Sequence, residues 1–158
     1  MSFERDIAAP VEGVWATMTD VNRYAERFSK IDAAVLTSDG SMDDGSFDVG
    51  TRWRETRTAH GRSASVDYCV TECDPHRRYL AECWSGARSF MEYVFVPSED
   101  GTRTTVRVTF WTRGGGPGFW LGSRLFRARI VECVVDHNNT DLADLARACE
   151  RRSVPSGR

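Results

Sequence analysis

The chain has 158 residues, of which 41% are apolar and 28% charged, and this mixture fits one soluble globular domain. Its formal net charge is −2, so no overall electrostatic field favours nucleic acid or an anionic membrane. The absence of any run of about 18 apolar residues excludes a membrane-spanning helix. The N-terminus lacks the basic and apolar stretches of a secretion signal, so we expect a cytoplasmic protein.

The first thirty residues predict a strand followed by two short helices. Residues 2–8 fit the strand, and Pro10 suits the first position of a helix, where its missing N–H costs nothing. The predicted helix, residues 10–18, has apolar side chains at helical spacing: Val11, Val14, Trp15 and Met18. Asp20 is expected to cap the second helix, whose apolar face holds Val21, Tyr24, Ala25 and Phe28.

From residue 31 the apolar side chains alternate with a period of two, which is typical of strands. The predicted strands are residues 31–37, 49–58, 62–73, 77–85, 89–97 and 103–112. Most of them are joined by short turns, so we expect antiparallel neighbours. The longer connection, residues 38–48, is acidic, but its spacing does not match a calcium-binding loop, and it is expected to be a solvated loop.

After a glycine-rich break at residues 113–118, the composition changes to that of a helix. Residues 119–150 contain no proline and only one glycine, which predicts a single helix about 45 Å long. Such a helix needs an apolar partner, and only the sheet can supply one. The sequence therefore predicts one α+β domain over residues 1–152, in which the long helix lies on a curved sheet of about six or seven antiparallel strands. Residues 153–158 are expected to form a flexible tail.

Short motifs in this order resemble the polyketide cyclase/dehydrase family of the START-like (SRPBCC) superfamily. They lie at residues 7–15, at Asp20 with the aromatic helix after it, at 49–53, 74–77 and 101–102, and at the helix end with Leu142, Leu145 and Glu150. The resemblance covers about residues 3–150. It implies a helix-grip fold with an internal cavity, shared by ligand carriers and by aromatase/cyclases. It implies no catalytic residue, because the family has no short catalytic signature to carry over.

Strand parity and the helical wheel predict which side chains line this cavity. The expected ligand-binding residues on the strands are Trp53, Glu55, Tyr68, Leu80, Glu82, Trp84, Met91, Tyr93, Phe95, Val108 and Phe110. The apolar sector of the long helix is expected to contain Val131, Val134, Val135, Leu142 and Leu145, with Asn138 near its centre. The sequence therefore predicts an apolar pocket with a few polar side chains that orient a ligand.

Three functions fit this pattern. The favoured one is binding of a hydrophobic, lipid- or polyketide-like small molecule, by a monomer or a homodimer. The alternative is a cyclase or dehydratase in which Glu55 or Glu82 serves as acid or base and Tyr68 and Tyr93 hold an oxyanion. Against that alternative, both glutamates could simply pair with arginines. In the third, the cavity is vestigial and the protein binds other proteins.

Cysteine and histidine residues give no sign of a cofactor or metal. The five cysteines, an odd number, are expected to be free thiols. Cys69 and Cys73 lie about 13 Å apart on one extended strand, so they cannot share a zinc ion with His60 or His76. His137, beside Asn138, is interpreted as a partly buried structural histidine. We therefore expect neither a metal nor a cofactor.

Overall fold

The computed structural model describes residues 1–37, 46–59, 61–84, 87–114 and 117–153. The predicted tail, apart from residue 153, and most of the predicted acidic loop lie outside the described residues. Seven strands form one antiparallel sheet in the order β1-β7-β6-β5-β4-β3-β2. They are β1 (Ser2–Ile7), β2 (Ala33–Leu36), β3 (Arg52–Ala59), β4 (Arg62–Asp74), β5 (Arg78–Trp84), β6 (Arg88–Pro97) and β7 (Thr104–Arg113). The predicted antiparallel sheet is confirmed.

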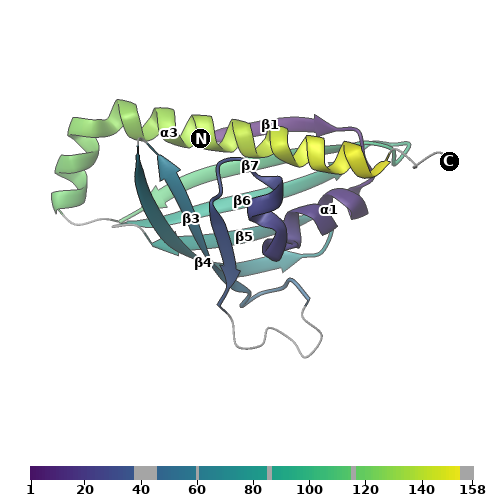
Figure 1. The fold of residues 1–158 in the computed structure, drawn as a ribbon, viewed down its shortest axis with the longest axis horizontal. Helices are drawn as coiled ribbons and strands as arrows, with labels where there is room; N and C mark the ends of the chain where they lie inside the picture. The colour runs from purple at the N-terminus through teal and green to yellow at the C-terminus, as the bar shows by residue number, and fades with distance from the viewer. Residues whose placement is uncertain (38–45, 60, 85–86, 115–116, 154–158) are drawn as a thin grey trace.

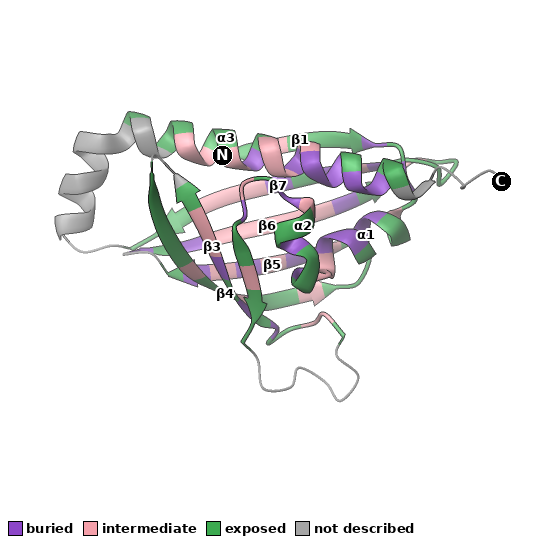
Figure 2. Ribbon diagram, viewed as in Figure 1, coloured by how far each residue is buried: buried purple, intermediate pink, exposed green. Residues whose placement is uncertain are grey.

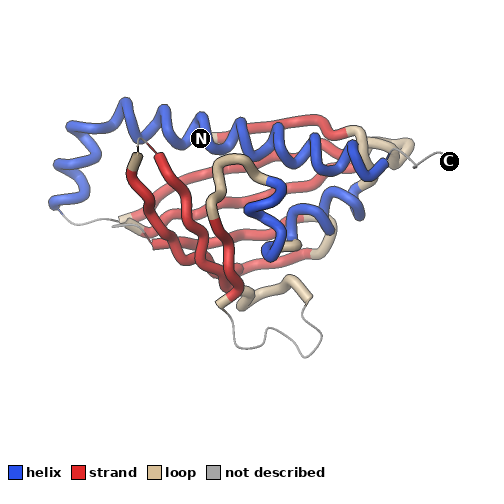
Figure 3. Tube along the Cα trace, viewed as in Figure 1, coloured by secondary structure: helices blue, strands red, loops and turns tan. Residues whose placement is uncertain are grey.

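The helices lie on one side of the curved sheet (Figures 1 and 3). They are α1 (Val11–Thr19), the 3-10 turn η1 (Val21–Arg23), α2 (Tyr24–Arg27) and the long α3 (Pro117–Ser153). Helix α3 runs along the whole sheet, and α1 packs against its C-terminal part. The chain order of strand, short helices, strands and long helix agrees with the prediction, and α3 extends a few residues beyond the expected bounds.

The predicted cap at Asp20 is wrong, because its side chain makes no capping hydrogen bond. Instead the carboxylate of Asp20 accepts a hydrogen bond of 2.7 Å from Arg27 Nη2. The Arg27 side chain is almost buried, and it also donates to the Thr17 carbonyl oxygen. A buried guanidinium needs a counter-charge, so it takes the carboxylate that would otherwise cap the helix.

The core lies between the sheet and the helices, where Figure 2 shows the buried residues of α1 and α3 facing the strands. Aromatic rings fill the part beneath α1. Trp15 makes edge-on contacts with Phe47, His76, Tyr79 and Phe95 at centroid distances of 5.2 to 6.2 Å. This aromatic cluster therefore forms the part of the core between α1 and the sheet.

Strand β5 has the opposite orientation to the predicted one. Tyr79 and Ala81 are buried, each 1% exposed, whereas Trp84 is 66% exposed. Leu80 and Glu82 share the outer face with Trp84, so the prediction that these three line the interior is wrong. Two physical reasons explain the error. Apolar side chains occur on both faces of β5, and an irregularity in β4 between Val70 and Glu72 shifts the pairing with β5 by one residue.

Helix α3 also differs in part from the predicted wheel. Val131 and Val135 are exposed, at 38% and 36%, although they were expected on the inner sector. Residues 134, 138, 142 and 145 face the interior as predicted, and residue 141 joins them. Val135 lies about 100° around the helix from Val134, which places the two side chains on different faces.

Candidate functional site

A cavity between the sheet and α3 consists of two adjoining chambers. The outer chamber, towards the β3–β4 hairpin, has a volume of about 260 Å³. The inner chamber beneath α2 measures about 30 Å³, room for a water molecule or two. The two chambers have five lining side chains in common, which are Glu55, Arg57, Tyr68, Met91 and Asp141. These five residues form the wall between the chambers.

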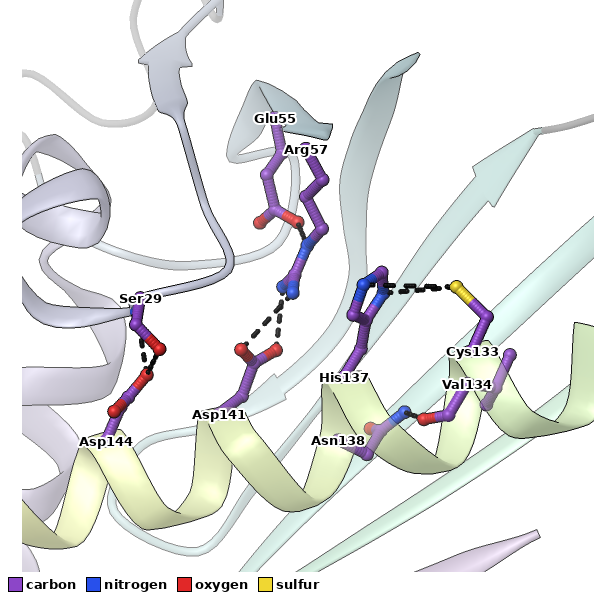
Figure 4. A network of polar contacts seen from close by, with 9 residues as sticks. All are labelled: Ser29, Glu55, Arg57, Cys133, Val134, His137, Asn138, Asp141 and Asp144. Carbon is purple, nitrogen blue, oxygen red and sulfur yellow. Dashed lines mark hydrogen bonds and ion pairs between the residues drawn. The ribbon is translucent and has the colours of Figure 1, made fainter. Parts of the chain in front are cut away.

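Three charged residues of this wall form a hydrogen-bonded cluster, the Glu55–Arg57–Asp141 cluster (Figure 4). Arg57 Nε donates to Glu55 Oε1 at 2.6 Å. Its Nη1 and Nη2 donate to the two carboxylate oxygens of Asp141 at 3.2 and 2.7 Å. The Arg57 guanidinium is therefore shared by one carboxylate from the sheet and one from α3.

Local structure explains how the cluster forms. Glu55 and Arg57 are two residues apart on β3, so both side chains project from the inner face of the sheet. Asp141 comes from the face of α3 directly opposite. The side chains are only 6% (Glu55), 18% (Arg57) and 19% (Asp141) exposed. Charges withdrawn from water in this way persist only when they are paired, and the bidentate Arg57–Asp141 geometry provides the pairing.

Burial changes the acidity of all three groups. It raises the pKa of Glu55 and of Asp141, and the nearby Arg57 charge offsets part of that rise. Burial alone would lower the pKa of Arg57, but the Asp141 and Glu55 carboxylates more than compensate and raise it. The guanidinium therefore stays charged, while the two carboxyls hold protons to higher pH than they do in water. Such carboxyls can give and take protons near a bound molecule.

Tyrosine hydroxyls supply further polar groups around the inner chamber. Burial raises the pKa of Tyr24, Tyr68, Tyr79 and Tyr93, so their hydroxyls remain protonated hydrogen-bond donors. Tyr24 already donates to the Met18 carbonyl oxygen at 2.6 Å. The rings stack in pairs, Trp53 with Tyr68 at 5.0 Å and Tyr79 with Tyr93 at 4.6 Å. These stacked rings form rigid aromatic walls, and the tyrosine hydroxyls are the polar groups at their edges.

Helix α3 contributes Cys133, Val134, His137 and Asn138 to the outer chamber. The Asn138 amide donates to the Val134 carbonyl oxygen at 2.8 Å, so its N–H group is satisfied within its own helix. Cys133 Sγ lies 3.8 Å from His137 Nδ1 and 3.9 Å from Nε2. Burial, with the positive Arg57 nearby, lowers the pKa of His137.

Comparison with known proteins identifies the family. Residues 1–147 match the family model described as polyketide cyclase / dehydrase and lipid transport. The chain belongs to this family. The family indicated by the sequence motifs is thereby confirmed. No curated protein matches the chain.

Solved structures agree with this family at the level of the fold. Zhui aromatase/cyclase from Streptomyces sp. R1128 has a TM-score of 0.74 at 20% identity, covering 99% of this chain and 96% of that one. The TTHA0849 protein of Thermus thermophilus has the same score and identity, covering 98% and 99%. A START superfamily protein from Mycobacterium smegmatis scores 0.71 at 15% identity, covering 97% and 98%. At these identities the likeness establishes the helix-grip fold alone.

In this member of the polyketide cyclase/dehydrase family, most of the predicted ligand-binding residues line the cavity. They are Trp53, Glu55, Tyr68, Met91, Tyr93, Phe110, Val134 and Asn138, while Val108 and Leu142 line a separate void of about 10 Å³. Phe95 is buried in the core against Trp15. Leu80, Glu82 and Trp84 point away from the cavity, and Glu82 accepts hydrogen bonds of 2.6 and 3.1 Å from Arg88. Contact with a ligand stays a prediction for every one of these residues.

Sequence reasoning missed the two residues that organise the site. Arg57 lies two positions after Glu55 on the same strand, so the parity that selected Glu55 could also have selected Arg57. Asp141 lies three positions after Asn138, which places it on the same helical face. The sequence alone does not identify either residue, because a charged side chain is rarely buried unless it is paired, and this pairing exists only across the cavity.

Proposed function

We propose that this protein binds a compact hydrophobic small molecule in the outer chamber, with the polar end of the molecule at the Glu55–Arg57–Asp141 cluster. The observation that carries the proposal is the position of this cluster, in the wall of a cavity that is otherwise lined largely by apolar and aromatic side chains. Small-molecule sites usually combine such walls with a few polar groups that fix orientation. The family's description, which names lipid transport, supports the same function.

Two features indicate what such a ligand would carry. The chamber of about 260 Å³ lies just below the roughly 300–1,000 Å³ of typical ligand sites, which favours a compact ligand. A guanidinium has five N–H groups, and Arg57 donates three hydrogen bonds to Glu55 and Asp141. Two N–H groups remain for an acceptor such as a carbonyl or hydroxyl oxygen.

The binding test uses a neutral fluorescent probe, N-phenyl-1-naphthylamine, whose emission rises in apolar surroundings. Val134→Phe narrows the outer chamber and should weaken binding of the probe about tenfold or more. Val135→Phe is the matched control, because this neighbouring side chain is exposed and does not line the chamber. Equal binding by the wild type and both variants, or no binding at all, would contradict the proposal.

A second candidate function is catalysis of cyclisation or dehydration. It is supported by two carboxyls, the buried Glu55 and the partly buried Asp141, whose raised pKa suits acid–base chemistry beside the chamber. Glu82, the other carboxylate of the sequence hypothesis, lies on the outer face and drops out. Water loss from a β-hydroxyketone, followed by ultraviolet absorbance, tests this function. Asp141→Asn should abolish turnover while the naphthylamine probe still binds.

The remaining expectations stay predictions. They are a monomer or homodimer, a cytoplasmic location, and the third hypothesis of a protein-interaction module with a vestigial cavity. Within the described part of the chain, no helix is both long and apolar enough to cross a membrane.

A further inference from the structure

Cys133 and His137 form a thiol–imidazole pair that the proposed function does not use. They are four residues apart on α3, so their side chains lie one turn from each other on one face of the helix. Cys133 Sγ is within 3.8 and 3.9 Å of the two ring nitrogens of His137. Both side chains are half-buried and both line the outer chamber. A bound molecule in that chamber would therefore meet the thiol.

The surroundings of His137 favour the neutral imidazole, the form that can accept a proton. Burial lowers its pKa, and so does the positive charge of Arg57 on β3. The negative charges of Asp141 and Asp136 on α3 raise the pKa of His137, and the positive charge of Lys30 lowers it further. Asp141 is held by Arg57 and so is not available as a direct partner of the imidazole.

We propose that Cys133 and His137 form a nucleophilic pair that captures α,β-unsaturated carbonyl compounds in the outer chamber. The inference rests on the proposed function in one respect, since the compound must enter the same chamber. It assigns to this chamber a covalent step, which reversible binding does not require. Nucleophilic cysteines in proteins are commonly activated by a neighbouring histidine in this way.

The step is an addition, and all atoms of both reactants remain in the product. His137 takes the thiol proton of Cys133, and the sulfur forms a bond to the β-carbon of the ligand. The electrons of the carbon–carbon π bond form a new π bond between the α-carbon and the carbonyl carbon, and the carbonyl π electrons move to the oxygen, which gives an enolate. The two remaining N–H groups of Arg57 can stabilise this oxygen, as an oxyanion hole does. The imidazolium then returns the proton to the α-carbon, which yields a thioether.

The other four cysteines are less suited to this reaction. Burial raises the pKa of Cys73 and of Cys83 to about 11 in each case, so their thiolates are scarce at neutral pH. Cys149 is buried at 2% exposure. Cys69 is half-buried like Cys133, but it lies on β4 with its side chain on the opposite face from Val70 and does not line the chamber. Cys69 is therefore the internal reference.

The test measures alkylation of each cysteine by 2-cyclohexen-1-one, a compact enone, with peptide mapping by mass spectrometry. We expect Cys133 to react at least about tenfold faster than Cys69, and His137→Gln to slow Cys133 by about tenfold or more. The reaction of Cys69 should be unchanged in that variant. The rate at Cys133 should also depend more steeply on pH in His137→Gln than in the wild type, because without the base only pre-formed thiolate reacts. Equal rates at Cys133 and Cys69, or no effect of His137→Gln in a variant with native circular dichroism, would overturn the proposal.

The same samples separate this inference from the proposed function. Binding of N-phenyl-1-naphthylamine and labelling of Cys133 are measured separately on the wild type, and Cys133→Ala, which should form no adduct at position 133, confirms the site of labelling. Binding of the naphthylamine without selective labelling of Cys133 would leave the binding function standing and reject the nucleophilic pair. Selective labelling of Cys133 that depends on His137, without binding of the naphthylamine, would support the nucleophilic pair and reject the proposed binding function.

Discussion

Arg57 on β3 and Asp141 on α3 tie the two walls of the cavity together through two hydrogen bonds of 2.7 and 3.2 Å. The two residues are 84 positions apart in the sequence. Their contact places an ion pair where the two chambers meet. The same ion pair therefore bears on the stability of the fold and on the chemistry of the cavity.

Arg57→Met tests the structural role of this pair. The substitution leaves Glu55 and Asp141 buried without their counter-charge, so the free energy of unfolding at pH 7 should fall by about 3 kcal/mol. Urea denaturation measures the change. Arg88→Met is the control, since Arg88 pairs with Glu82 on the outer face and is well exposed. That variant should lose no more than about 1 kcal/mol, and a similar loss in both variants would contradict the role assigned to Arg57.

The raised pKa of Glu55 predicts how stability depends on pH. Because the folded chain holds this proton more tightly than the unfolded chain, the contribution to stability is complete below the ordinary value of 4.5 and is lost as pH rises through the raised pKa. Glu55→Gln removes this titration. The stability of Glu55→Gln relative to the wild type should therefore increase between pH 4 and pH 7, measured by urea unfolding at each pH.

Asp67→Asn provides a control of opposite sign for that measurement. The hydrogen bond from Arg54 lowers the pKa of Asp67, so its contribution is present above the ordinary value of 3.8 and is lost as pH falls through the lowered pKa. The stability of Asp67→Asn relative to the wild type should decrease as pH rises. If the relative stability of Glu55→Gln also decreased as pH rises, as that of Asp67→Asn should, the raised pKa assigned to the buried Glu55 would be contradicted.

The orientation of β5 can be tested with two neighbouring substitutions. Ala81 lines the inner chamber and is 1% exposed, so Ala81→Phe should overpack the interior and cost about 1–3 kcal/mol of stability. Leu80→Phe, on the outer face, should change stability by about 0.5 kcal/mol or less. Thermal denaturation followed by circular dichroism distinguishes them. The reverse order of effects would support the orientation predicted from the sequence.

Asp144 joins α3 to the segment that follows α2. Its Oδ2 accepts hydrogen bonds from the backbone N–H and the hydroxyl of Ser29, at 2.7 and 2.8 Å, and the residue is 3% exposed. Asp144→Ala would remove both bonds to Ser29 and the ion pair with Arg147, so we expect a loss of about 1–3 kcal/mol in urea unfolding. Asp136→Ala, which breaks only the exposed contact with Lys30, should cost about 1 kcal/mol at most. Equal effects of the two variants would argue against this link between α3 and the segment after α2.

Local signals in the sequence determined the elements of this protein and their order. The helical spacing of Val11, Val14 and Met18 predicted α1, and the period of two with short turns predicted an antiparallel sheet. The lack of proline between residues 119 and 150 predicted α3. Parity also placed Trp53, Glu55 and Tyr68 on the inner face correctly, because on β3 and β4 the apolar side chains concentrate on one side. Each of these features depends on interactions between residues close in sequence, so the sequence alone carries them.

Only the tertiary structure decided which side of β5 faces inward and which charges meet in the cavity. On β5, Leu80 and Trp84 compete with Tyr79 and Ala81 for the interior, and the irregularity in β4 settles the register. The pairing of Arg57 with Asp141 depends on the distance between a strand and a helix that are far apart in the chain. The free energy of a buried charge depends on that partner and on exclusion from water, and neither exists until the sheet and α3 have packed together.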